Sequence, residues 1–282
     1  MKTIDLHVHS NHSDGTLRPS ELVTLAHESG LSAFALTDHD TVSGVSEAVE
    51  AAKTLELRDG SSVKVIPGIE VSAVYGSREI HILGLNVDDT NRKFLAVLEK
   101  YQRERDERNQ RMVRLLADQG FDISMETLKE AYPHTVLTRA HFARYLKDHG
   151  YVVSMQEAFL KYIGEGAVCY IPKKEISPKE AISSIHLAGG HPVLAHPPQY
   201  NLSKQELEVL VRELVSHGLE GIEAIYSTYS QRDERSMRDL AKKFNLYLTG
   251  GSDFHGSNKP MIQLGRGLGN LQVPHSFLEN IL

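Results

Sequence analysis

Short apolar and β-branched runs alternate with longer amphipathic stretches along most of this chain. Seven of the short runs have the length and composition of buried or half-buried strands. They cover residues 3–8, 33–37, 63–71, 79–85, 192–195, 220–225 and 246–250. Helical periodicity occupies five stretches between most of these runs, at residues 19–29, 43–56, 178–188, 203–217 and 230–244. Strands that alternate with helices are typical of parallel βα units, so the pattern predicts an α/β fold with a barrel or a doubly wound sheet.

This alternation is interrupted between the fourth and fifth predicted strands. We therefore predict two domains, an α/β domain formed by residues 1–87 and 178–282 and a small helical insertion formed by residues 88–177. Arg105 and Arg108 lie on a helical stripe of the insertion that should be buried. Thr138 is placed as the N-cap of a second helix, over residues 139–148. The positions of the stripe are 94, 98, 101, 105, 108, 112 and 115.

Composition and charge narrow the function classes. The chain has 282 residues, with 31 Lys and Arg against 37 Asp and Glu, and this net charge of −6 argues against a surface that binds nucleic acid throughout. The sequence contains no run of about 18 apolar residues that would predict a membrane span, and its polar first residues do not resemble a secretory signal. One cysteine excludes an internal disulfide and favours the cytoplasm. Histidine is the unusual residue, with 15 copies in a chain without tryptophan.

Several of these histidines lie at or near the ends of predicted strands. His7 and His9 are two residues apart, so on a strand both imidazoles would face the same side. Asp253 and His255 repeat this spacing. Because functional residues of βα proteins gather at the C-terminal ends of strands, residues distant in the chain should meet in one site. The candidate metal ligands are His7, His9, Asp14, His39, Glu70, His81, His196, Asp253 and His255.

The chemistry of this set indicates a multinuclear site. Six imidazoles and three carboxylates without a thiolate suit Zn²⁺, Mn²⁺ or Fe²⁺. Nine ligands exceed the needs of one ion, so we expect two or three divalent ions, with Glu70 as a candidate bridge. A structural role is the commoner explanation for any one histidine, but it does not explain the repeated placement at strand ends. Other carboxylates are candidates to support the ligands: Asp5 to orient an imidazole, Asp38 and Asp40 for a direct or supporting role, and Glu223 on the sixth strand.

The motifs that carry these residues resemble the PHP (polymerase and histidinol phosphatase) family over residues 1–86 and 180–270. The resemblance implies a distorted seven-stranded βα barrel with a di- or trinuclear metal centre that hydrolyses phosphoesters. The motifs are DLHVHS at 5–10, SDGT at 13–16, LTDHDT at 36–41, PGIE at 67–70, EIHILG at 79–84, LAHP at 194–197 and GSDFHG at 251–256.

The resemblance also implies how the ligands divide among the ions. A hydroxide that bridges two ions would attack the phosphorus. Catalytic roles are expected for Asp253 and, as proton donors to the leaving oxygen, for His196 or His255. Some family members have a histidine where this chain has Asp14, which leaves the metal of the third site open. The first ion would bind His7, His9, Glu70 and Asp253, the second Glu70, His81 and His196, and the third Asp14, His39 and His255.

The insertion carries the candidate substrate-binding residues. Its first helical stretch has eight basic residues against four acidic ones. Arg105 and Arg108 fit either a solvated helix, with their guanidinium groups in water at the edge of the stripe, or a phosphate clamp that Asn109 assists. Thr138 and Arg139 begin the second helix, where an N-terminus can bind an anion. The insertion would then be a cap that binds a second phosphate or a nucleotide.

We therefore predict a metal-dependent phosphomonoesterase that removes the 3′-phosphate of a nucleoside 3′,5′-bisphosphate. The insertion resembles that of the PHP subgroup that acts on such bisphosphates, related members of which trim short RNA from the 5′ end. The alternatives are a 5′-3′ exonuclease on short oligoribonucleotides, a histidinol-phosphate-type phosphatase, and a non-catalytic, metal-stabilised module like that of replicative polymerases. The complete ligand set and the lack of a polymerase-sized domain after residue 282 argue against the last. The expected partner is a small phosphorylated substrate, such as a nucleotide or a short RNA end, without a membrane or an extensive nucleic-acid surface.

Overall fold

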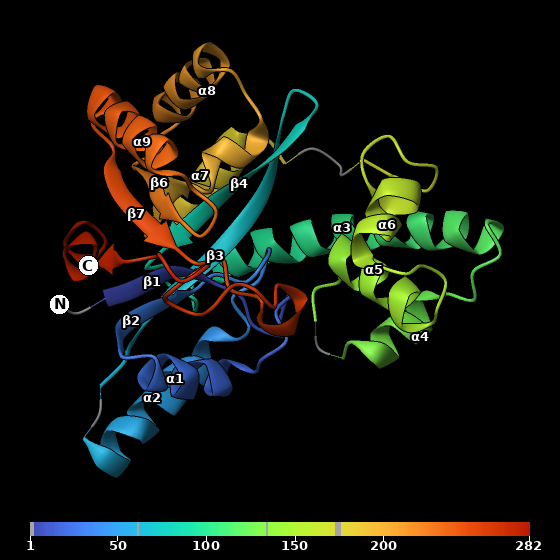
Figure 1. The fold of residues 1–282 in the computed structure, drawn as a ribbon, viewed down its shortest axis with the longest axis horizontal. Helices are drawn as coiled ribbons and strands as arrows, with labels where there is room; N and C mark the ends of the chain where they lie inside the picture. The colour runs from blue at the N-terminus through green and yellow to red at the C-terminus, as the bar shows by residue number, and fades with distance from the viewer. Residues whose placement is uncertain (1–2, 61, 134, 173–175) are drawn as a thin grey trace. The chain divides into compact units, whose positions relative to one another are not determined.

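The computed structural model describes residues 3–60, 62–133, 135–172 and 176–282 (Figure 1). The chain divides into two compact units, of which unit 1 comprises Met1–Val97 and Ile176–Leu282 and unit 2 comprises Leu98–Glu175. The first boundary lies inside helix α3 (Arg92–Asp118), whereas the sequence pattern placed it in the preceding loop, at residue 88.

Unit 1 is built around one mixed sheet of eight strands in the order β7-β6-β5-β4-β3-β2-β1-β8 (Figure 1). All seven predicted strands are present. The eighth strand, β8, was not predicted, because two residues carry no periodic pattern. The bounds are β1 (Thr3–Val8), β2 (Leu31–Leu36), β3 (Lys64–Tyr75), β4 (Arg78–Leu85), β5 (His191–Leu194), β6 (Gly221–Tyr226), β7 (Tyr247–Gly251) and β8 (Val273–Pro274).

Strand β4 departs from the parallel βα pattern, because it is antiparallel to both of its neighbours. Strands β3 and β4 form a hairpin around Gly76 and Ser77, and Gly76 has a φ of 61°. A link of this length cannot hold the crossover helix that a parallel pair needs. The pairs β1–β2, β2–β3, β5–β6 and β6–β7 are parallel, as expected for βα units.

Contacts between the first and seventh strands close this sheet toward a barrel. Val8 and Phe254 form a parallel bridge just beyond β7. The Asp253 amide donates to the His7 carbonyl at 2.9 Å, and the His9 amide donates to the Phe254 carbonyl at 3.0 Å. Gly251 permits this approach, since a Cβ there would lie 2.5 Å from the His7 nitrogen. The predicted distorted seven-stranded barrel is confirmed, with β8 added beside β1.

The helices predicted for unit 1 are also present. Helices α1 and α7 begin with a proline. Helices α7, α8 and α9 are each preceded by a serine whose hydroxyl accepts a hydrogen bond from a backbone amide of the first turn. Such caps satisfy amides that have no partner inside the helix. The bounds are α1 (Pro19–Glu28), α2 (Val45–Asp59), α7 (Pro178–Leu187), α8 (Lys204–Ser216) and α9 (Gln231–Phe244).

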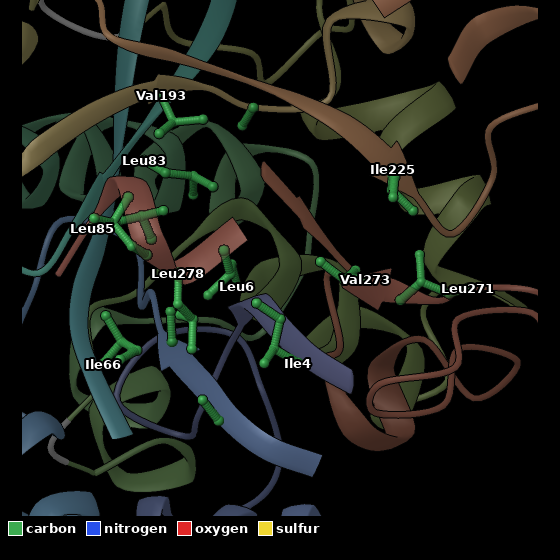
Figure 2. Packing of buried hydrophobic residues seen from close by; sticks show 14 residues of the cluster. Ile4, Leu6, Ile66, Leu83, Leu85, Val193, Ile225, Leu271, Val273 and Leu278 are labelled. Carbon is green, nitrogen blue, oxygen red and sulfur yellow. The ribbon is translucent and has the colours of Figure 1, made fainter. Parts of the chain in front are cut away.

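Apolar side chains from most of the strands pack together in the core of unit 1 (Figure 2). Ile4 and Leu6 of β1 belong to this cluster, together with Leu83 of β4 and Leu278 near the C-terminus. The alternate position His7 is equally buried but belongs to a polar cluster. Strand alternation therefore separates the packing residues of β1 from its polar residues, as the H-x-H spacing predicted.

Unit 2 is helical and has an apolar core of its own, to which Cys169 belongs. After α3 it contains α4 (Met125–Ala131), α5 (Arg139–Asp148), α6 (Met155–Ala158) and a π-helical turn, η1 (Phe159–Ile163). Helix α5 has the predicted bounds, with Thr138 as its N-cap. Among the helices of the described residues, none is long and apolar enough to cross a membrane.

Candidate metal centre

The nine candidate ligands converge in unit 1. They come from β1, β3 and β4 and from the loops that follow β1, β2, β5 and β7. Their potential ligand atoms form four overlapping groups, in each of which the atoms lie within 4.8 Å of one another. The groups are His9, Asp14, His39 and His255; His7, Glu70 and His196; His7, His9 and Asp253; and His39, Glu70 and His81.

Glu70 lies at the centre of this cluster. Its carboxylate is 1% exposed and lies within 3.4 Å of five imidazoles, through both of its oxygens. Such a position suits the bridging role predicted for it. The distances from Oε2 are 3.4 Å to His7 Nε2, 3.2 Å to His9 Nε2 and 3.3 Å to His39 Nδ1, and those from Oε1 are 2.8 Å to His81 Nδ1 and 3.1 Å to His196 Nε2.

Asp14 and Asp253 flank the cluster and share His9 and His255. Asp14 Oδ1 lies 3.2 Å from His255 Nε2 and 3.6 Å from His9 Nδ1. Asp253 Oδ1 lies 3.4 Å from His9 Nε2 and 3.3 Å from His255 Nδ1. The His9 and His255 rings stack with their centroids 4.2 Å apart. These nitrogens and oxygens are therefore close enough to share ions.

The buried imidazoles have nitrogen atoms that the protein itself does not satisfy. Among the described residues, no hydrogen bond reaches His7 Nε2, His9 Nε2, His39 Nδ1 or His196 Nδ1, although all four atoms are buried. Unsatisfied buried polar atoms are costly and mark functional sites. Lone pairs on nitrogen beside carboxylate oxygens form the donor set that Zn²⁺, Mn²⁺ and Fe²⁺ accept, so these residues fit the ions that the family resemblance implies.

The electrostatics of the cluster also fit cations. Burial alone would raise the pKa of Glu70, but the imidazoles of His39, His81 and His7 hold it well below its usual range. Burial opposes the charge on His81 as well, yet Glu70 raises its pKa to about 10. In His39, desolvation dominates and lowers the pKa to about 3. Glu70 is thus ionised and His39 neutral near neutral pH, and the proton on His81 supplies positive charge that a metal ion would replace.

Comparison with known proteins identifies the family to which the chain belongs. Residues 5–172 match the PHP domain family. The chain belongs to the PHP domain family. It is 36% identical to the 5′-3′ exoribonuclease Rnm of Escherichia coli, over 94% of this chain and 88% of the relative. It is 34% identical to the 3′,5′-nucleoside bisphosphate phosphatase of Chromobacterium violaceum, over 96% of this chain and 92% of the relative.

A solved structure extends the similarity to the fold. It comes from Bifidobacterium adolescentis and is provisionally assigned as a metal-dependent phosphoesterase. The two chains are 29% identical and superpose with a TM-score of 0.86, over 100% of this chain and 96% of the other. The fold of this PHP protein, including its insertion, thus has a solved counterpart.

Glu223 supports the ligands of this PHP protein more directly than its sequence position suggested. It is fully buried on β6 and accepts a hydrogen bond from His7 Nδ1 at 3.2 Å. Its other oxygen accepts from the His196 amide at 2.7 Å. A carboxylate bound to Nδ1 fixes the tautomer of the ring and directs Nε2 of His7 toward Glu70.

The prediction that Asp5 orients an imidazole is wrong. Its buried carboxylate instead accepts from the Ser252 amide and hydroxyl at 2.8 and 2.6 Å, and from the Gly265 amide at 2.8 Å. Asp38 has a similar structural role, because it accepts from the hydroxyls of Ser10 and Ser13, both at 2.6 Å. Both carboxylates anchor ligand-bearing loops through donors that are distant along the chain, which sequence spacing does not show.

The backbone at three of these loops is left-handed. Asp40, His196 and Asp253 have φ values of 53°, 30° and 57°. Non-glycine residues in this region cost on the order of 1–3 kcal/mol and concentrate at functional sites, where the surrounding structure holds them. At His196 and Asp253 the strained backbone belongs to a candidate ligand.

Two residues at the cluster were missed by the sequence analysis. The Tyr226 hydroxyl donates to Asp253 Oδ2 at 2.6 Å, and the Lys259 ammonium contacts the same oxygen at 2.5 Å. Tyr226 ends β6, so the strand-end rule that found the ligands could have included it. Lys259 follows the short 3-10 helix η3 (Gly256–Asn258), and no periodic pattern marks it.

The candidate substrate-binding residues belong to unit 2. Arg105 and Arg108 are 4% and 5% exposed, so the alternative of a solvated helix is wrong. The Arg108 guanidinium donates to Asn109 Oδ1 at 2.9 Å, and Asn109 Nδ2 donates to the Leu137 carbonyl at 2.9 Å. This chain of hydrogen bonds ends next to Thr138, whose hydroxyl accepts from the Ala140 amide at 3.2 Å. The guanidinium of Arg139 lies 5.6 Å from the ring centre of Tyr170.

Proposed function

We propose that this PHP protein hydrolyses a phosphomonoester, the 3′-phosphate of a nucleoside 3′,5′-bisphosphate, at a centre of two or three divalent ions. The observation that carries this proposal is the contact of Glu70 with five imidazoles inside a cluster of nine nitrogen and oxygen ligands. Mn²⁺, Fe²⁺ and Zn²⁺ all accept such ligands, and thiolate is absent from the proposed set. When bound, such ions neutralise charge on phosphoryl oxygens and lower the pKa of water.

The residues of the chain have separate roles in this proposal. Glu70 contacts five imidazoles from four segments of the chain, and Glu223 fixes His7 and the backbone of His196. Asp253 contributes Oδ1 to the cluster while Tyr226 holds its other oxygen. These contacts set the ligand geometry before substrate binds, which reduces the reorganisation needed during the reaction.

A proton for the leaving oxygen can come from an imidazole in the cluster, and the geometry favours His196 over His255. His255 Nδ1 lies 2.9 Å from the Asp253 carbonyl and must donate its proton there, while its Nε2 lies 3.2 Å from Asp14. His196 uses Nε2 toward Glu70 and has no hydrogen bond at Nδ1 among the described residues. His196 therefore retains one ring nitrogen, Nδ1, which can transfer a proton when it is protonated and binds no metal ion.

Specificity for a bisphosphate is assigned to unit 2. Arg108 and Asn109 are joined to the backbone before Thr138, and helix α5 begins with Arg139. Arg105 lies one helical turn before Arg108 and is also buried. Guanidinium groups bind phosphate oxygens with two parallel hydrogen bonds, and the amides at a helix start favour an anion. We assign the 5′-phosphate of the substrate to these groups.

A second candidate is 5′-3′ exonuclease activity on short oligoribonucleotides. It is supported by the relative from Escherichia coli, which bears that name and is as similar to this chain as the bisphosphate phosphatase relative. Both reactions hydrolyse a phosphoester. They differ in whether the 3′ substituent is a phosphate or the rest of an RNA chain.

Product analysis separates the candidates. The Mn²⁺-loaded protein is assayed with adenosine 3′,5′-bisphosphate, AMP, histidinol phosphate and a 5′-phosphorylated oligoribonucleotide. We expect AMP and inorganic phosphate from the bisphosphate, with kcat/KM at least about tenfold above that for AMP because AMP lacks the second anchored phosphate. Stepwise release of mononucleotides without hydrolysis of the bisphosphate would favour the exonuclease. Preference for histidinol phosphate would reject both, and a metal-loaded protein inactive on every substrate would indicate a non-catalytic module.

A further inference from the structure

The two carboxylate oxygens of Asp253 have different surroundings. Oδ1 faces the imidazoles of His7, His9 and His255 at 3.3–3.6 Å. Oδ2 contacts the Tyr226 hydroxyl at 2.6 Å and the Lys259 ammonium at 2.5 Å. One oxygen therefore serves the cluster, and two donors meet at the other.

These two donors are not equivalent. Tyr226 is 5% exposed, and its hydroxyl accepts from Gln199 Nε2 at 2.8 Å, so it is fixed on both sides. The Lys259 side chain is 40% exposed, against 7% for Asp253. Tyr226 satisfies Oδ2 from the buried side, and Lys259 is the donor that an incoming ligand can reach.

The loop that presents Lys259 is bonded to the loop that follows β1. Asn258 Nδ2 donates to the Asp14 carbonyl at 2.7 Å, and the Ser257 amide donates to Thr16 Oγ1 at 2.9 Å. The residue before Lys259 is thus bonded to the backbone of a candidate ligand. Anchoring of this kind holds a long, flexible side chain near a defined position before substrate arrives.

We propose that Lys259 is a phosphate-binding residue, which contacts the phosphoryl group undergoing hydrolysis. This proposal rests on the proposed function, because it assumes that a phosphoester is the substrate. An ammonium group has three N–H donors, and within the described residues only Asp253 is bonded to it. The remaining donors are available to a dianionic phosphoryl group. A protonated lysine has no lone pair, so it complements the metal ligands without competing with them.

The simpler explanation is that Lys259 only orients Asp253. In that case its removal would disturb the metal ions, as removal of Tyr226 should. A phosphate-binding role predicts the opposite, because the metal ions would remain and phosphate affinity would fall. Metal content and phosphate affinity therefore separate the two roles, and neither depends on turnover.

The test uses Mn²⁺-loaded protein with inorganic phosphate as the probe. Metal content is measured by mass spectrometry, and phosphate binding by titration calorimetry, for wild type, Lys259→Met, Lys259→Arg and Tyr226→Phe. Lys242→Met, on the exposed face of α9, is the matched control. We expect Lys259→Met to keep its ions and to bind phosphate about tenfold more weakly, as for loss of a charge-assisted hydrogen bond. Lys259→Arg should retain most of the affinity, Tyr226→Phe should lose metal, and the control should match wild type.

Unchanged phosphate affinity in Lys259→Met, or loss of metal from it, would overturn the proposal. If the methionine variant does not fold, Lys259→Gln gives the same comparison with a polar side chain. The result is independent of the substrate assignment. A wild type that hydrolyses no bisphosphate, but whose phosphate affinity depends on Lys259, would reject the proposed substrate and support the phosphate site.

Discussion

The barrel and the insertion both bury charged side chains, but the partners of those side chains come from different distances along the chain. In the barrel, Glu70 contacts His7 from β1 and His196 from beyond β5, which the parallel strands bring to one place. In the insertion, Arg108 and Asn109 contact each other and the backbone of Leu137. Topology gathers the barrel residues, whereas a helical stripe determines only which residues of the insertion are buried. The barrel cluster should therefore control chemistry, and the insertion should control which substrate is used.

The largest loss of metal binding and activity is expected from Glu70→Gln. The substitution keeps the shape of the side chain but removes the charge that five imidazoles contact, so at least one ion should be lost and kcat should fall about 1000-fold or more. Metal analysis and phosphate release measure the two effects. Glu50→Gln, on the exposed surface of α2, is the control and should match wild type. Full metal content with near-normal kcat in Glu70→Gln would contradict the central position of Glu70.

Arg108→Ala should separate specificity from chemistry. We expect about a tenfold or larger rise in KM for adenosine 3′,5′-bisphosphate, because a guanidinium contact to phosphate is lost, while metal content and the rate with AMP change little. Steady-state kinetics on both substrates measure this split. Arg108→Lys keeps the charge but not the paired geometry, so it should restore only part of the affinity. Equal kinetic constants for Arg108→Ala and wild type on the bisphosphate would contradict the proposal that Arg108 binds a phosphate.

The rise in Tm that bound Mn²⁺ causes should be larger at higher pH. The pKa of His9 is raised to about 9 and that of His81 to about 10, so protonation of these rings stabilises the metal-free fold fully below the unfolded pKa of about 6.5. This stabilisation is lost as the pH rises through 9 to 10. Ions need the same nitrogens without protons, so Mn²⁺ should raise Tm by about 5 °C more at pH 8.5 than at pH 6. Thermal melts with Mn²⁺ and with EDTA test this, and an equal or smaller shift at pH 8.5 would contradict it.

The smallest effect is expected on the stability of the insertion, from removal of the N-cap of α5. Thr138→Ala removes the hydroxyl that accepts from the Ala140 amide at the start of α5, and loss of such a cap costs about 1 kcal/mol. Chemical denaturation should show this loss, and Thr138→Ser should recover most of it. A destabilisation of more than about 3 kcal/mol would mean that Thr138 has a larger structural role than a cap.

The sequence was most informative where local pattern and topology agree. The H-x-H spacing of His7 and His9 predicted which face of β1 carries imidazoles. The rule that functional residues lie at the C-terminal ends of strands predicted that residues as distant in the chain as Asp14 and Asp253 belong to one site. The direction of β4 was missed, although the short link through Gly76 leaves no room for a helix. Tyr226, at the end of β6, was missed because the candidate ligands were limited to imidazoles and carboxylates.

Other features depend on geometry that no sequence pattern encodes. Asp5 shares a strand face with His7, yet it binds Ser252 and Gly265 because the β7 loop folds back against β1. Lys259 reaches Asp253 only through a loop held by Asn258. In the insertion, the stripe predicted the burial of both arginines but not the hydrogen bond from Arg108 to Asn109. Side-chain directions in loops are therefore the part of the site that required the structure.

The central claim is that the nine clustered side chains form one multinuclear metal centre. Anomalous diffraction from crystals of the Mn²⁺-loaded protein, collected on both sides of the manganese absorption edge, tests it most directly. The account predicts two or three manganese peaks, each coordinated by members of the cluster, with Glu70 shared between two of them. A single peak, or peaks outside these nine residues, would contradict it.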